Sequence, residues 1–268
     1  MALVRDCLKF LIFDLGLSSD QRSALDQGIL PLGSAASVRS VNISSWPPHL
    51  SSARARGPNK GWKPLLLLEA AGSARGGFVL WLDAGSVVHS RLAEVRRWLR
   101  DYGFVATLSS EGEIRQLTHP GMLKYLGIDM DNATEAALLS SSEEGDASHS
   151  YRGTEILGQP MLGGGLIGFD TSLKRKKALE SAQGDANAIS PMNILNDWAQ
   201  CSLVQSCIAP DGAQVQNHRF ERSSLSVLVY QMAPELPIMP FGEELGVSAA
   251  FTAQGEKSGY ELQVDVVF

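Results

Sequence analysis

The sequence lacks several features that would assign it to a particular class of protein. Only 19% of its 268 residues are charged, and the net charge of −6 leaves no basic excess. Because nucleic-acid-binding proteins need such an excess, we expect no nucleic-acid partner. No apolar run approaches the roughly 20 residues that cross a bilayer, so we also expect no membrane span in this chain.

Cysteine is scarce as well. The three cysteines are Cys7, Cys201 and Cys207. The short spacing of the last two permits a local disulfide, and a pair of buried thiols is the alternative. Charged residues are scattered through Met1–Phe10, which is not the pattern of a signal peptide. The sequence therefore carries no targeting segment that we recognise, and a cytoplasmic location stays open.

Short apolar runs alternate with helical patterns along most of the chain. The strongest run, Phe78–Leu82, reads FVLWL and ends at Asp83. Segments Arg91–Tyr102 and Glu221–Met232 space their apolar residues as amphipathic helices do. This alternation predicts an α/β fold with a Rossmann-like, mostly parallel sheet and helices on both faces. Ligands of such sheets bind beyond the carboxyl ends of the strands.

The chain is long enough for one large domain, which we place at residues 1–232. Residues 129–158 are polar, include the run SSSEEG, and predict an exposed insertion. Residues 233–268 form a tail that is rich in proline at first and then resembles a strand, and we expect it to pack onto the domain or extend from it.

Asp83 and His218 are the first candidates for chemistry. A carboxylate at the end of an apolar strand can hold a divalent cation that bridges two phosphates, and the alternative is a side chain that caps the turn. A neutral imidazole at His218 can complete a Mn²⁺ site, although a lone histidine is more often structural. His218 precedes a good helix, in which Glu221 stands in the first turn.

Two further segments suit ligand contact. Lys63 can reach a phosphate and Trp62 can form the wall of a ring pocket, whereas a hydrophobic staple at a helix start is the alternative for this segment. Gly163, Gly164 and Gly165 precede a strand-like run, and such a loop allows the backbone to approach a ligand closely. A merely flexible loop is the alternative.

Asp14 suggests a different chemistry. The apolar run that ends in Phe13-Asp14-Leu15-Gly16 resembles the start of a haloacid-dehalogenase-type phosphatase. Those enzymes need a second aspartate two residues after the nucleophile, and Gly16 occupies that position here. We therefore rank a phosphatase below the other hypotheses.

Several short motifs in a fixed order carry a family resemblance. They are FDLGLS at 13–18, WKP at 62–64, WLDAG at 81–85, THPGMLKYLG at 118–127, GLIGF at 165–169, Trp198, Cys201, CIAP at 207–210 and HRFERSSL at 218–225. Over about residues 11–230 this order resembles a poorly characterised eukaryotic family of GT-A type nucleotide-diphospho-sugar transferases. The resemblance implies GT-A topology, a nucleotide-sugar donor, and a hydroxyl acceptor on a glycan, a protein or a small molecule.

The resemblance also implies roles for individual residues. Asp83 and Glu221 would be the catalytic carboxylates, and Asp83 and His218 would hold Mn²⁺ or Mg²⁺. The cysteine pair matches a pair in the family, and a disulfide there would imply the Golgi lumen or another secretory compartment. Substrate contacts are assigned to Trp62, Lys63, Gly163, Gly164, Gly165 and Arg219.

Departures from the family pattern define the alternative hypothesis. Gly85 replaces the second aspartate of the usual Asp-x-Asp motif, and Arg222 stands where glutamine is usual. Family members also begin with an additional strand before Leu11, and the loss of a central strand would expose sheet edge. The alternative function is a non-catalytic binding or scaffold module.

Overall fold

The fold is taken from a computed structural model of the whole chain. It describes residues 9–51, 59–74, 77–83, 86–88, 92–128, 130, 150–172, 190–239, 247–249 and 264–267. Most of the predicted insertion at 129–158 and most of the predicted tail at 233–268 lie outside these residues. The part of the tail that is described packs against the domain, because Met239 exchanges backbone hydrogen bonds with Ala106 and Leu108 on β5.

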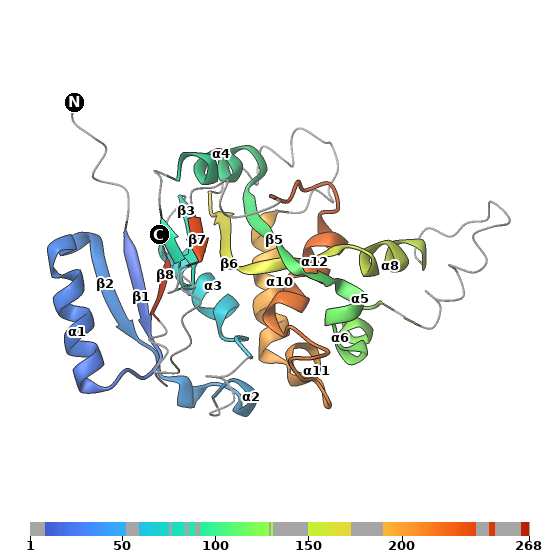
Figure 1. Ribbon diagram of the computed structural model, residues 1–268, viewed down its shortest axis with the longest axis horizontal. Helices are drawn as coiled ribbons and strands as arrows, with labels where there is room; N and C mark the ends of the chain where they lie inside the picture. The colour runs from blue at the N-terminus through green and yellow to red at the C-terminus, as the bar shows by residue number, and fades with distance from the viewer. Residues whose placement is uncertain are drawn as a thin grey trace, which may run out of the picture.

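Six strands form one sheet in the order β2-β1-β8-β3-β6-β5 (Figure 1). Their bounds are β1 Phe10–Asp14, β2 Ala36–Ser40, β3 Phe78–Leu82, β5 Phe104–Glu113, β6 Pro160–Asp170 and β8 Val264–Val267. A separate pair consists of β4, Ser86–Val88, and β7, Val247–Ala249. Strand β8 comes from the last part of the sequence and lies between β1 and β3.

The prediction of a mostly parallel, Rossmann-like sheet is wrong. Among the described strands only β1 and β2 pair in parallel. Strand β8 pairs antiparallel with both β1 and β3, and β6 pairs antiparallel with both β3 and β5. The GT-A topology that was expected from the motifs is therefore not the topology of this sheet. Alternation of strands and helices along the sequence does not fix strand direction, because side chains alternate in the same way in both kinds of ladder.

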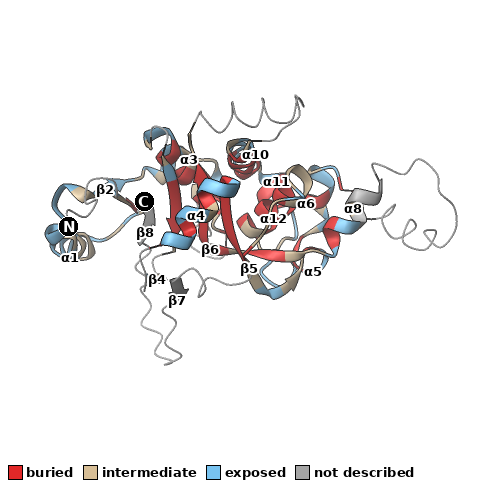
Figure 2. Ribbon diagram, turned by 90° about the horizontal axis from the view of Figure 1, so that it is seen from above, coloured by how far each residue is buried: buried red, intermediate tan, exposed pale blue. Residues whose placement is uncertain are grey.

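Helices cover both faces of the sheet. One face packs against α3 Lys63–Ser73, α10 Pro191–Leu203 and α12 Glu221–Met232, and the other face packs against α4 Ala93–Tyr102. In Figure 2, α4 lies on the opposite side of the strands from α3 and α10, and the strands between them are largely buried. Consecutive residues of β3 divide between the two cores, since Val79 and Trp81 join the first and Leu80 and Leu82 the second.

Further helices lie around this three-layer centre. Helix α1 stands beside β1 and β2, and Ser18 closes a capping box with Gln21 at its start (Figure 1). The helices at the other end of the molecule pack around α12 and are α5, α6, α8 and α11. The bounds are α1 Ser19–Ile29, η1 Leu30–Ala35, η2 Ile43–Ser45, α2 Pro48–Ser51, α5 Ile114–Leu117, α6 Pro120–Tyr125, α8 Ser150–Leu157 and α11 Gln205–Ile208.

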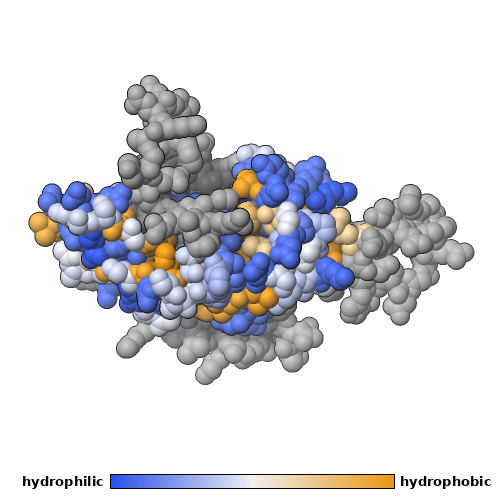
Figure 3. Space-filling view, turned by 90° about the horizontal axis from the view of Figure 1, so that it is seen from below, coloured by the Kyte–Doolittle hydropathy of each residue, from blue (hydrophilic) through white to orange (hydrophobic). Residues whose placement is uncertain are grey.

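The face seen in Figure 3 is mainly hydrophilic, and apolar atoms of the described residues appear there in small separate groups. Across the described part of the chain, no helix is both long and apolar enough to span a bilayer.

Candidate functional site

Asp83 directly follows β3 and is held by three neighbours. Its Oδ1 accepts hydrogen bonds from Lys63 Nζ at 2.7 Å and from Trp81 Nε1 at 2.8 Å. Lys60 Nζ lies 3.7 Å from its Oδ2. Burial raises the pKa of this carboxyl, but Lys63 and Lys60 outweigh burial, so the net pKa is lowered. Asp83 is therefore ionised at neutral pH, and 30% of its side chain is exposed.

Lys63 is a fully buried ammonium in the first turn of α3. Besides Asp83, its Nζ donates to the carbonyl oxygen of Gly164 at 2.7 Å. A buried charge is tolerated only when it is paired and hydrogen-bonded in this way. Its neighbour Trp62 is only 2% exposed, and the Trp62 ring lies 5.8 Å from the Trp81 ring in the core. Trp62 therefore packs in the core against Trp81, and its ring is not exposed to a ligand.

The three glycines that were predicted as a loop lie inside β6. A side chain at Gly163 would meet Thr107 on β5 at 2.8 Å, so the two backbones approach closely there. A Cβ at Gly164 would lie 3.0 Å from Arg222, and one at Gly165 would lie 3.9 Å from Asp83 Oδ2. Gly164 therefore leaves space that Arg222 and Lys63 occupy, and Gly165 lies beside Asp83.

Glu221 is the first residue of α12 and is 4% exposed. Its Oε2 is fully buried and accepts no hydrogen bond from any residue that the structure describes. Burial raises the pKa of this carboxyl, and the nearby charges of Lys63, Arg222 and Lys60 oppose that rise only in part. A buried carboxyl with a raised pKa and an unpaired oxygen is a common property of residues that act on a ligand.

Two arginines and one glutamate extend the site towards solvent. Glu111 Oε2 accepts from Arg219 Nε at 2.6 Å and from Arg222 Nη2 at 2.9 Å. Burial raises the pKa of Glu111, and the two arginines more than reverse that effect, so the net pKa is lowered. We call the whole group the charged cluster, which consists of Lys60, Lys63, Asp83, Glu111, Arg219, Glu221 and Arg222.

Both ring nitrogens of His218 are bonded to backbone groups, so neither is available to bind a metal ion together with Asp83. Its Nδ1 accepts a hydrogen bond from the backbone N–H of His119 at 3.2 Å, and its Nε2 lies 3.0 Å from the carbonyl oxygen of Ile208. These partners fix the neutral tautomer that carries its proton on Nε2. Burial lowers the pKa of His218 to about 4. The imidazole holds the chain before α12 in place.

The donor set around Asp83 does not suit a divalent cation. Within the residues that the structure describes, no three His, Cys, Asp or Glu side chains gather as metal ligands. One Asp83 oxygen is already bonded to an ammonium and an indole, and both nitrogens of His218 are bonded to backbone groups. Mn²⁺ or Mg²⁺ at Asp83 and His218 stays a prediction that this arrangement of side chains does not favour.

Asp14 has a structural environment at the end of β1. Its Oδ1 accepts from the backbone N–H groups of Gly16 and Leu17, and its Oδ2 pairs with Arg22 at 3.2 Å. These bonds cap the turn after the strand, and they lower the pKa of Asp14 although burial acts in the opposite direction.

Cys201 and Cys207 form a disulfide that links α10 to α11.

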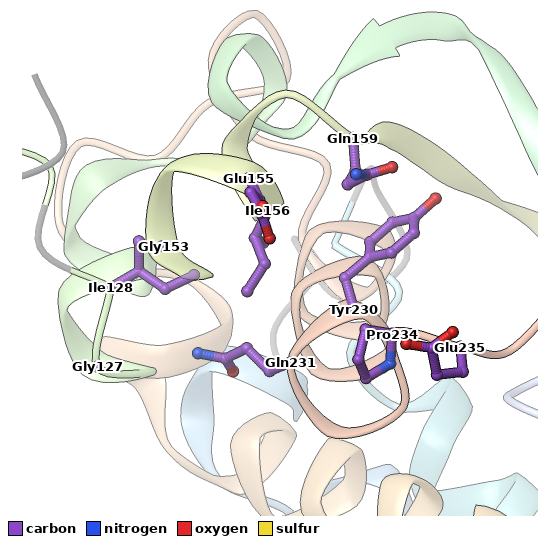
Figure 4. A pocket seen from close by; sticks show the side chains of 10 residues that line it. All are labelled: Gly127, Ile128, Gly153, Glu155, Ile156, Gln159, Tyr230, Gln231, Pro234 and Glu235. Carbon is purple, nitrogen blue, oxygen red and sulfur yellow. The ribbon is translucent and has the colours of Figure 1, made fainter. Parts of the chain in front are cut away.

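A separate cavity of about 590 Å³ lies where α6, α8 and α12 end (Figure 4). In Figure 4, Tyr230 and Gln159 lie side by side at its rim. None of the predicted site residues lines this cavity, whose walls are Gly127, Ile128, Gly153, Glu155, Ile156, Gln159, Tyr230, Gln231, Pro234 and Glu235.

Sequence reasoning missed Glu111 and Lys60 as parts of the site. Glu111 gives no sequence signal, because it lies in a polar stretch and meets Arg219 and Arg222 only after β5 and α12 have packed together. Lys60 stands three residues before Lys63, and the prediction used only the second lysine. A search for charged residues near each candidate could have included Lys60.

No protein-family model matches the chain, and neither curated proteins nor solved structures give a significant match. The family resemblance therefore rests on the short motifs alone.

Proposed function

We propose that the chain binds a nucleotide-diphosphate sugar at the charged cluster and transfers the sugar to a hydroxyl acceptor. The observation that carries this proposal is buried Lys63, which pairs with the partly exposed Asp83 beside the glycines of β6. Glu221, whose Oε2 has no partner among the described residues, lies near enough for the charge of the same lysine to offset part of the rise in its pKa. A fold does not retain buried charges and an unsatisfied oxygen for stability, because both are costly.

Each group has a role in this transfer. Asp83 is ionised and accepts hydrogen bonds from hydroxyl groups of the ribose or the sugar. Lys60 and Arg222 counter the charge that grows on the diphosphate as the bond to the anomeric carbon breaks. The acceptor oxygen forms the new bond to that carbon, and the electron pair of the old bond leaves with the diphosphate. Glu221 positions the sugar or, when ionised, takes the proton of the acceptor hydroxyl, and its raised pKa suits that exchange.

A binding module without catalysis is the second candidate. It is favoured by the contacts of Asp83, because Lys63 and Trp81 already occupy one of its oxygens. Under this proposal the cluster holds a nucleotide or a sugar and changes no bond. Measured turnover distinguishes the two candidates.

The Cys201–Cys207 disulfide is relevant to the cellular compartment in which the protein works. Disulfides persist in secretory compartments and are rare in the cytosol. It supports a proposal that the protein works in the Golgi lumen or elsewhere in the secretory pathway.

The test is a thermal-shift titration with UDP-sugars and GDP-sugars, run with Mn²⁺ and again with a chelator. A donor at about 100 times its dissociation constant adds roughly 2.7 kcal/mol of stability, which raises the melting temperature of a chain of this size by about 5–10 °C. We expect Asp83→Asn to lose most of this shift. The variant keeps the shape of the side chain and an oxygen for Lys63, so it should fold.

Asp14→Asn is the matched control, because it makes the same change at the end of another strand. It should keep the donor shift of the unmodified protein. No shift with any donor, from protein that melts cooperatively, would contradict both candidates at this cluster. A shift without release of the nucleotide diphosphate in the presence of hydroxyl acceptors would favour the binding module.

A further inference from the structure

Two arginines converge on one carboxylate oxygen at the edge of the charged cluster. Arg219 Nε and Arg222 Nη2 both donate to Glu111 Oε2, at 2.6 and 2.9 Å. A single carboxylate is a poor match for two guanidinium groups, which can together bind several oxygens of a phosphate group. The arrangement resembles an anion site in which a side chain of the protein takes the place of the ligand.

The charge balance favours a more highly charged anion than a carboxylate. The charged cluster contains four cations and three carboxylates, and burial favours the neutral form of one of them, Glu221. The cluster is thus locally positive in a chain whose net charge is −6. An excess of cations around a partly buried site attracts and stabilises a phosphate-bearing ligand.

Arg222 connects this anion site to the rest of the cluster. Its side chain passes over Gly164, where an added Cβ would lie 3.0 Å from both its Cγ and its Cδ and 3.5 Å from Lys63 Nζ. The aliphatic part of Arg222 therefore lies close to Gly164 and to Lys63, while its guanidinium contacts Glu111. Arg222 also belongs to the first turn of α12, and the N-terminus of a helix favours a bound anion.

The position of the Glu111 side chain allows it to move away from Arg219 and Arg222. Its side chain is 40% exposed, and it stands where the pairing of β5 with β6 is interrupted between Leu108 and Glu113. Gly112 next to it has a φ of 139°, a backbone conformation that favours glycine. Rotation of Glu111 into solvent therefore costs two partly exposed ion pairs and no strand hydrogen bond.

We propose that Arg219 and Arg222 form a diphosphate-binding site, which Glu111 occupies as an internal competitor until the ligand displaces it. The proposal extends the proposed function by assigning the diphosphate of the donor to these two arginines. It needs no metal ion, because the charge of the ligand is countered by side chains.

Isothermal titration calorimetry of the full chain with inorganic pyrophosphate, in low salt and chelator, tests the proposal. Glu111→Gln removes the competitor and keeps the size of the side chain, so we expect it to bind pyrophosphate roughly five- to tenfold more tightly than the unmodified protein. Arg222→Gln should bind pyrophosphate more weakly than the unmodified protein, and Arg219→Gln provides the same test if that variant does not fold.

Glu94→Gln is the control for a general loss of negative charge. Glu94 forms a similar exposed ion pair with Arg97 on α4, at 2.7 Å, and its substitution should leave pyrophosphate binding unchanged. Unchanged or weaker binding by Glu111→Gln would overturn the proposal, as would an equal gain in Glu94→Gln. Equal affinity for inorganic phosphate and pyrophosphate would overturn the assignment of a diphosphate.

Together with the thermal-shift titration with nucleotide sugars, this experiment separates the diphosphate site from the proposed function. If pyrophosphate binds as expected but no nucleotide sugar does, the diphosphate site stands and the sugar-transfer function fails. If nucleotide sugars bind and Glu111→Gln changes nothing, the donor site stands and the role of Glu111 as competitor fails.

Discussion

At the scale of single residues, two carboxylates that look alike in the sequence, Asp83 and Glu221, differ in ionisation because they differ in burial and in charged neighbours. Asp83 is partly exposed and surrounded by lysines, so it stays ionised. Glu221 is buried with an unpaired oxygen, so its neutral form is favoured. His218 is buried between two backbone groups, which leaves it neutral. The sequence could propose each of these residues for a site, but their ionisation depends on which side chains pack against them.

We predict that His218 makes stability fall in mild acid. Its folded pKa of about 4 lies below the ordinary value of 6.5. The stabilising contribution is therefore complete above pH 6.5 and is lost as the pH falls towards 4, with a total of about 3 kcal/mol. Urea unfolding at several pH values should show this loss, and the slope should be smaller in His218→Asn. Ring-proton NMR should show no titration of His218 between pH 7.5 and 5.5, and a midpoint near 6.5 would contradict the prediction.

At the scale of elements, the predicted helix at 221–232 and the strand at 78–82 are confirmed. Long periodic segments are the part of a fold that a sequence expresses best. The glycines at 163–165 were placed in a loop, whereas β6 continues through them. Their role depends on Thr107 and Arg222 on neighbouring elements, and no local pattern reveals such contacts.

We expect Gly164→Ala, a substitution in β6, to lower stability and to weaken pyrophosphate binding at the charged cluster. The added methyl group would lie 3.0 Å from Arg222 and would push its side chain away from Lys63. We expect about 1–2 kcal/mol of destabilisation and weaker pyrophosphate binding. Gly72→Ala on α3 is the control, because no atom of the described residues lies within 4 Å of the added group outside its own helix turn, and it should raise stability by about 0.5–1 kcal/mol. Equal effects of the two substitutions on stability and binding would refute this account.

At the scale of the whole molecule, one late strand joins two parts of the sheet. Strand β8 pairs with β1 at Ile12 and with β3 at Leu82 through the same residue, Val266. Without it, the parallel pair β1–β2 has no strand partner in the antiparallel set β3-β6-β5. Strand β8 thus covers one edge of β1.

A chain that ends at Gly259 should therefore lose its cooperative unfolding. We expect hydrogen exchange to accelerate in β1 and β2, while the amides of β5 and β6 stay protected. The two exposed strand edges should also promote self-association, which size-exclusion chromatography can detect. If β1 keeps the protection of the full chain, β8 does not hold the two parts together.

The sequence by itself indicated the strand at 78–82 and the helix at 221–232, because side-chain periodicity is a local property. It also placed Lys63 and Asp83 among the candidates, since charged residues beside apolar elements are visible in a one-dimensional pattern, whereas Glu221 and Arg219 were proposed from the family resemblance. Only the tertiary structure decided the strand directions, the insertion of β8 and the meeting of Glu111 with Arg219 and Arg222. These depend on contacts between residues that are distant in the sequence, and periodicity within one element contains no information about them.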